Sequence, residues 1–182
     1  MRATKLVAIA AHSGSYDESL EEAARRLVAS LTTHCGDVAL LLGGYWGLMK
    51  VVADEALSRG LTVVILPPLE REHESFPEKA IVVRTGVSYR VRSVFLARSC
   101  DAMVALGGAA GVIQEAVTAY TESKTVFLLK SGLDSDKLEA LAPYLDYRRL
   151  APILVYSDPE SLARDLCAYL SSRDQSVVTE HG

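Results

Sequence analysis

Leu41-Leu42-Gly43-Gly44-Tyr45-Trp46-Gly47 and Ala105-Leu106-Gly107-Gly108-Ala109-Ala110-Gly111 are two copies of one pattern. Each is an apolar run, then Gly-Gly-x-x-Gly, then a stretch with helical spacing. Glycine lets the backbone turn tightly and approach a ligand without a side chain in the way. A helix that starts there offers free N–H groups and the positive end of its dipole, which favour a phosphate. The two loops together predict a site for a nucleotide or a phosphorylated sugar.

The composition is that of an ordinary globular domain. The 182 residues suffice for one full-sized core, so we expect a single domain over residues 1–170 and a polar, frayed tail over 171–182. The net charge of −4, with no long basic run, argues against sequence-independent binding of nucleic acid. No apolar stretch reaches the roughly 20 residues that cross a bilayer, so we expect no membrane segment.

The cysteines and the N-terminus bear on the compartment. Cys35, Cys100 and Cys167 lie far apart and show no metal-ligand spacing, so we expect reduced thiols, no metal site and a cytoplasmic protein. The apolar run near the N-terminus is too short for a signal peptide and is better interpreted as a buried first strand.

Short apolar runs alternate with helical stretches along the whole chain. Strands are predicted at residues 5–10, 37–42, 61–66, 102–106, 125–129 and 153–156, with a short extended piece at 80–84; helices are predicted at 17–31, 46–59, 88–99, 111–121, 136–147 and 159–170. The charged stretch 69–78 between them is interpreted as a surface excursion. This alternation predicts an α/β fold: a Rossmann-like, doubly wound, mainly parallel sheet with helices on both faces. With the strand order 3-2-1-4-5-6 of that class, the loops at 12–16, 43–47 and 107–111 meet in one crevice.

Polar residues near these loops have two interpretations each. Ser15 fits a helix cap with Glu18 in a capping box, whereas Ser13 fits a donor to a phosphate. His12, at a strand end, faces the crevice or is an ordinary polar neighbour. Glu115, one turn after Gly111, either stabilises the helix dipole or acts at the rim of the phosphate pocket.

The two motifs carry a resemblance to a known family. Gly43-Gly44-x-x-Gly47-Leu48-Met49 and Gly107-Gly108-x-x-Gly111-x-x-x-Glu115 resemble the two signatures of the LONELY GUY and "possible lysine decarboxylase" group. That group belongs to a Rossmann-like superfamily that also includes molybdenum-cofactor carriers and DNA-processing protein A. The looser Gly-Gly-x-x-Gly form resembles the uncharacterised microbial branch close to the carriers.

The resemblance implies an activity and an assembly. LONELY GUY enzymes cleave the N-glycosidic bond of cytokinin riboside monophosphates, and their catalytic arginine and glutamate fall on Arg92 and Glu115. Their adjacent lysine falls on Ser93 and a phosphate-binding threonine on Val112, so the pocket differs here. Lysine decarboxylation is not supported, because no pyridoxal-phosphate lysine site is evident. Family members pair through helices beside the site, which implies a homodimer or higher homo-oligomer through the apolar positions of residues 87–96.

Two functions remain open at this point. One is a carrier or sensor that binds a small nucleotide-like phosphorylated ligand, its cofactor unknown; the residues predicted to hold it are Ser13, Gly43, Gly44, Gly47, Gly107, Gly108 and Gly111. The alternative is a nucleoside 5′-monophosphate phosphoribohydrolase in which Arg92 orients the substrate and Glu115 stabilises the ribosyl cation. A third interpretation is a protein whose ancestral site has decayed.

Overall fold

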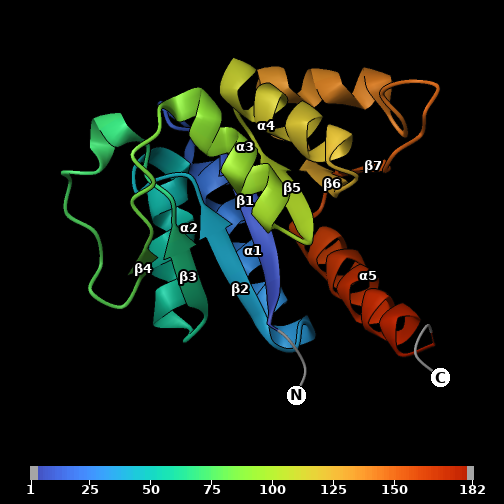
Figure 1. Cartoon of the computed structure of the whole chain (residues 1–182), viewed down its shortest axis with the longest axis horizontal. Helices are drawn as coiled ribbons and strands as arrows, with labels where there is room; N and C mark the ends of the chain where they lie inside the picture. Colours follow the sequence, from blue (N-terminus) through green and yellow to red (C-terminus); the bar gives the residue numbers. More distant parts are fainter. Residues whose placement is uncertain (1–3, 180–182) are drawn as a thin grey trace.

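A parallel sheet forms the centre of the molecule. The computed structural model describes residues 4–179, and in them seven strands are ordered β4-β3-β2-β1-β5-β6-β7 (Figure 1). The strands are β1 (Lys5–Ala11), β2 (Val38–Leu42), β3 (Thr62–Ile65), β4 (Ile81–Val82), β5 (Ala102–Leu106), β6 (Thr125–Leu129) and β7 (Ile153–Tyr156). Every pairing is parallel. Without the two-residue edge strand β4 the order is 3-2-1-4-5-6, which confirms the predicted fold class and its switch point between β1 and β5.

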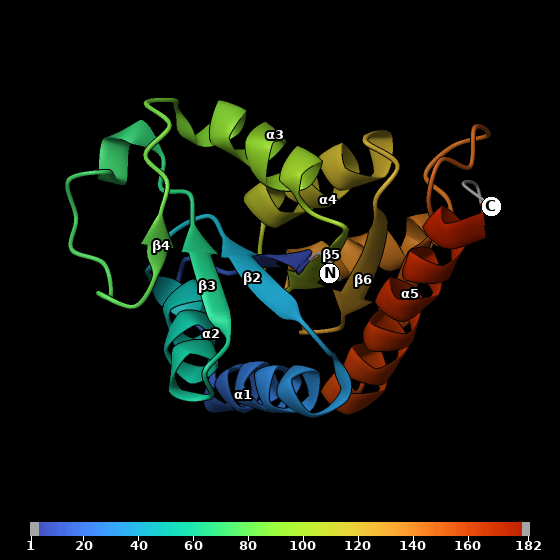
Figure 2. The ribbon, with the colours of Figure 1, turned by 60° about the horizontal axis from the view of Figure 1, so that its bottom comes forward.

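Helices cover both faces of this sheet. They are α1 (Glu18–His34), α2 (Gly47–Ser58), α3 (Tyr89–Ser99), α4 (Ala110–Thr121) and α5 (Pro159–Thr179), with the 3-10 segments η1 (Leu69–Arg71) and η2 (Asp134–Leu141). Figure 2 shows α1, α2 and α5 on one face, and α3 and α4 on the other. Val7 and Ile9 of β1 pack into the first layer, whereas Ala8 and Ala10 pack into the second. The alternation is that of a strand buried on both faces.

The ends of the helices follow their capping residues. Asp17, not Ser15, begins α1: its carboxylate accepts the N–H of Leu20 at 2.9 Å. The prediction of Ser15 as the cap is therefore wrong. A carboxylate satisfies the same free N–H as a serine and also interacts favourably with the positive helix end. At α5 another aspartate has the same role: the carboxylate of Asp158 accepts the N–H of Ser161 at 2.7 Å.

Two further helix predictions need correction. The predicted helix at 136–147 is instead the 3-10 segment η2, which ends at Leu141. Pro143 follows, and proline lacks an N–H and disfavours helical backbone in the residue before it. The last helix does not end at residue 170 but continues to Thr179, so most of the expected tail is helical. Residues 180–182 of that tail lie outside the described residues.

The expectation of three reduced thiols is wrong as well. Cys35, at the end of α1, and Cys167, on α5, form a disulfide with their Cα atoms 4.8 Å apart. Cys100 is the free cysteine and is buried. The sequence separation of 132 between Cys35 and Cys167 hid the pair, because only the packing of α1 against α5 brings them together. None of the helices described within residues 4–179 is long and apolar enough to cross a membrane.

Candidate functional site

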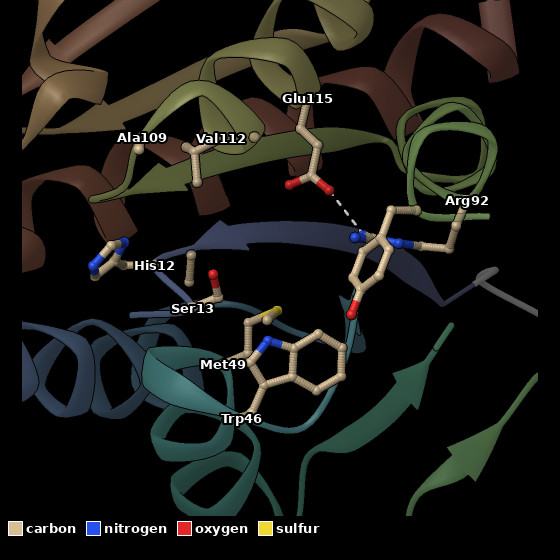
Figure 3. A pocket seen from close by; sticks show the side chains of 11 residues that line it. His12, Ser13, Trp46, Met49, Arg92, Ala109, Val112 and Glu115 are labelled. Atoms are coloured by element: carbon tan, nitrogen blue, oxygen red, sulfur yellow. Dashed lines mark hydrogen bonds and ion pairs between the residues drawn. The ribbon is translucent and has the colours of Figure 1, made fainter. Parts of the chain in front are cut away.

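A cavity opens at the switch point, where the chain leaves β1 and β5 in opposite directions. Ala11 and Leu106 are neighbours in the sheet and are the last residues of these strands. The cavity beyond them has a volume of about 190 Å³ (Figure 3). It is lined by Ala11, His12, Ser13, Trp46, Met49, Tyr89, Arg92, Ala109, Gly111, Val112 and Glu115. The predicted crevice therefore exists, built from the ends of β1, α2 and α4 and from α3.

A buried ion pair forms one wall. Nη1 of Arg92 on α3 donates to Oε1 of Glu115 on α4 at 2.8 Å, and both side chains are more than nine-tenths buried. The hydroxyl of Ser93 donates to the same oxygen at 2.9 Å. Nε of Arg92 is buried and has no hydrogen-bond partner within the described chain. The structure thus brings together the two residues that the resemblance singled out, and places Ser93 beside them where the family has a lysine.

The first turn of α4 forms the end of the cavity that lies opposite the ion pair. Ala109 precedes this helix and has no side-chain oxygen with which to cap it. Ala109, Gly111 and Val112 all line the cavity, so the first turn borders the open space. An uncapped helix start leaves N–H donors and a partial positive charge, which together favour an anion.

Most of the predicted glycines serve packing between elements. A Cβ at Gly43 would overlap Nη1 of Arg92 and lie 2.5 Å from its Cζ. A Cβ at Gly44 would overlap the indole of Trp46, and one at Gly108 would overlap Cγ2 of Val112. The first loop therefore needs glycine because side chains of the protein itself occupy that space.

The remaining predicted residues divide between the lining and the loops behind it. Gly47 has a φ of +54° and lies against the backbone of His12 and Ser13; the next residue, Leu48, donates its N–H to the carbonyl of His12 at 2.8 Å. Gly107 lies against Leu20 and Ser131. Of the seven predicted ligand-binding residues, Ser13 and Gly111 are the ones that line the cavity within the described chain.

Sequence reasoning missed the aromatic side of the cavity. The rings of Trp46 and Tyr89 meet edge to face, with centroids 6.5 Å apart. The guanidinium of Arg71, from η1, lies 4.9 Å from the centre of the Trp46 ring. Trp46 lies inside the first motif, but nothing in the spacing connects it with Arg71, which belongs to the stretch that the sequence predicts to be a surface excursion.

His12 lines the cavity without a metal-binding arrangement. Its Nε2 lies 3.1 Å from the carbonyl oxygen of Ser15. Within residues 4–179, no group of three or more histidine, cysteine, aspartate or glutamate side chains is placed to hold a metal ion.

Comparisons with solved structures agree with this architecture. A structural-genomics target called TM1055 is 27% identical and superposes with a TM-score of 0.79, covering 90% of this chain and 98% of that one. A molybdenum cofactor binding protein from Rippkaea orientalis, 19% identical, covers 93% and 99% of the two chains with a TM-score of 0.76. The molybdenum cofactor carrier protein from Chlamydomonas reinhardtii, 22% identical, gives the same coverage and TM-score. At 19% and 22% identity, the likeness to these two proteins shows a shared fold.

Sequence comparisons identify the family. An uncharacterised protein of Archaeoglobus fulgidus is 35% identical over 119 residues, which are 65% of this chain and 76% of that protein. The model of the SLOG cluster4 family matches residues 5–161. These matches confirm the resemblance to this superfamily, and TM1055 and the carriers share its fold. The chain belongs to the SLOG cluster4 family.

Proposed function

We propose that the chain binds a nucleotide-like phosphorylated ligand in this cavity and acts as a carrier or sensor of it. The observation that carries the proposal is the uncapped first turn of α4, which borders a cavity walled by the buried pair of Arg92 and Glu115. The family and the carrier proteins of the same fold support a nucleotide-related binding role.

The phosphate is expected at the first turn of α4. Backbone N–H groups around Gly111 supply donors there, and the exposed hydroxyl of Ser13 lies on the same cavity. Val112 stands where the family has threonine and offers no hydroxyl, so this chain relies more on backbone donors. The sugar then lies toward Glu115.

The buried ion pair favours a second candidate function, hydrolysis of an N-glycosidic bond. Arg92 and Ser93 both donate to Oε1 of Glu115, and the other carboxylate oxygen is turned toward the cavity in Figure 3. A carboxylate held there stabilises the positive charge that develops on the sugar as the C1′–N bond breaks. Water then adds to C1′, which gives the free base and ribose 5-phosphate.

One set of measurements separates these functions. Mass spectrometry of the gently purified protein identifies any retained ligand, and calorimetry with AMP, GMP, CMP and UMP measures affinity. Release of base and ribose 5-phosphate from the same compounds measures turnover. Binding without turnover supports the carrier or sensor; a protein that retains nothing and binds none of the four contradicts the proposal.

Glu115→Gln tests the hydrolase directly. If the chain turns over a nucleotide, this variant should lose at least about 10²-fold in kcat, or roughly 2.7 kcal/mol of transition-state stabilisation. Because the buried Arg92 then lacks its partner charge, an unfolding curve of the variant checks that the fold is retained. Glu122→Gln is the matched control, because Glu122 ends the same helix and pairs with Arg98 away from the cavity. Equal turnover by wild type and Glu115→Gln would remove Glu115 from the mechanism.

We also propose that the protein is a homodimer that pairs through α3. Val91, Val94 and Phe95 on this helix are 45, 36 and 40% exposed, an apolar strip on a surface helix beside the cavity. Sedimentation at micromolar concentration should give a mass of about twice the 19.7 kDa of one chain. Phe95→Glu should shift this mass toward that of a single chain. A wild-type species of 19.7 kDa would contradict the pairing.

A further inference from the structure

We propose that Trp46 and Tyr89 form the stacking platform for a planar, nucleobase-like ring of the ligand, and that Arg71 holds this platform in place. The inference rests on the proposed function and adds to it the chemical class of the ligand's far end. It concerns three side chains from three separate segments: the start of α2, the start of α3 and η1.

The indole of Trp46 is held at its outer edge by the first loop. A side chain at Gly44 would overlap Cη2, Cζ3 and Cζ2 of the six-membered ring, so this edge of the indole lies against Gly44. Because Trp46 immediately precedes α2, its backbone is fixed by the start of that helix. The ring is therefore in position before any ligand arrives, which reduces the entropy lost on binding.

Tyr89 and Arg71 support the ring from other directions. Tyr89 meets Trp46 at an interplanar angle of 78°, the edge-to-face arrangement that aromatic pairs prefer. Arg71 packs its guanidinium over the indole and donates from Nε to the hydroxyl of Tyr89 at 3.1 Å. Its Nη1 also pairs with Glu74, which fixes the guanidinium in turn.

The platform lies where the rest of a nucleotide must go. Trp46 lies across the cavity from Val112 and Glu115 (Figure 3). The volume of about 190 Å³ is below the roughly 300 Å³ at which sites for whole organic ligands begin, so part of a complete nucleotide would extend beyond it. Tyr89 is 39% exposed while Arg92 and Glu115 are buried, so the aromatic side is the more open one. A ring that extends from the sugar on this side meets the two aromatic residues.

Intrinsic fluorescence gives a direct readout, because Trp46 is the single tryptophan of the chain. With the full-length protein, AMP, GMP, CMP or UMP that stacks on Trp46 should change its emission, whereas ribose 5-phosphate should bind by calorimetry with little change. Trp46→Leu should weaken binding of the responding nucleotide by about 5- to 100-fold, the range of base stacking on an aromatic residue. The affinity for ribose 5-phosphate should stay within about twofold.

Two conservative variants separate stacking from loss of fold. Trp46→Phe keeps an aromatic ring and should retain most of the affinity for the nucleotide. Arg71→Gln should weaken nucleotide binding but not ribose 5-phosphate binding. The control is Arg59→Gln, because Arg59 also pairs with a glutamate, Glu55, but lies outside the cavity. Unfolding curves of each variant show whether the fold is intact.

The outcomes are distinguishable. If neither ribose 5-phosphate nor any nucleotide binds, the proposed function fails. If ribose 5-phosphate binds but each nucleotide binds no tighter, or if Trp46→Leu binds nucleotide as the wild type does, the stacking inference alone is overturned.

Discussion

Arg92 and Gly43 depend on each other. The guanidinium of Arg92 occupies the space that a side chain at residue 43 would need, and this position lets it reach Glu115. A buried ion pair is favourable only with good geometry, because both charges have left water. The glycine of the first motif therefore supports the charge arrangement of the site through the absence of a Cβ.

Gly43→Ala should destabilise the protein and disturb the cavity. The added methyl group overlaps Nη1 of Arg92, so either the arginine moves away from Glu115 or the loop shifts. Overpacking of this kind costs about 1–3 kcal/mol in the free energy of unfolding. Denaturant unfolding measures the loss.

Gly111→Ala is the control for this substitution. A Cβ there meets no atom within 4 Å in the described structure, and the residue lies in the first turn of α4, where alanine favours the helix. Its free energy of unfolding should equal or slightly exceed that of the wild type. If Gly43→Ala is as stable as Gly111→Ala, the close contact with Arg92 has no energetic weight.

At the level of elements, the start of α5 links stability to pH. Asp158 accepts hydrogen bonds at the helix start from Ser161, and these bonds lower the pKa of its carboxyl from 3.8 to about 2. Since the folded pKa is below the unfolded one, the charged cap stabilises the fold above about pH 4. This contribution is lost as the pH falls through about 2.

We therefore expect acid to act partly through Asp158. Asparagine caps helices about as well as aspartate but does not titrate, so Asp158→Asn is the matched variant. The Tm of the wild type should exceed that of Asp158→Asn at pH 5, and the difference should shrink toward pH 2. Thermal unfolding followed by circular dichroism at several pH values checks this; a difference that is constant with pH would contradict it.

The elements themselves were well predicted from the sequence. The buried runs around β1, β2 and β5 and the apolar face of α1 are local patterns, and a chain of alternating strands and helices has few allowed orders. The resemblance also aligned Arg92 and Glu115 with a known catalytic pair, but it did not predict the ion pair that joins them. For the strands, the helices and their order in the sheet, local sequence patterns were therefore sufficient.

Contacts between distant segments were not predictable in this way. The packing of Arg71 on Trp46 depends on where the stretch after β3 folds back, and no periodicity describes that path. The expected ligand-binding role of Gly43 and Gly44 rested on the general behaviour of glycine loops. It did not reveal that Arg92 and Trp46 lie against these two residues.

For the whole molecule, the state of the three cysteines is directly measurable. Burial raises the pKa of Cys100 to about 11, so its thiol is both covered and protonated at neutral pH. A thiol reagent at pH 8 should find no reactive group in the native protein, one after denaturation, and three after denaturation with reduction. Three thiols without reduction would restore the expectation of a reduced, cytoplasmic protein.

The Cys35–Cys167 disulfide should also set much of the global stability. It ties the end of α1 to α5 and closes a loop of more than a hundred residues, so it restricts the unfolded chain strongly. Replacing both cysteines by serine should lower the free energy of unfolding by about 2–5 kcal/mol, measured by denaturant unfolding without reductant. A reductant should bring the wild type to the same midpoint and leave the double variant unchanged, because only the wild type has a bond to lose. Equal midpoints for the two proteins without reductant would mean that the packing of α1 against α5 stabilises the fold without the covalent link.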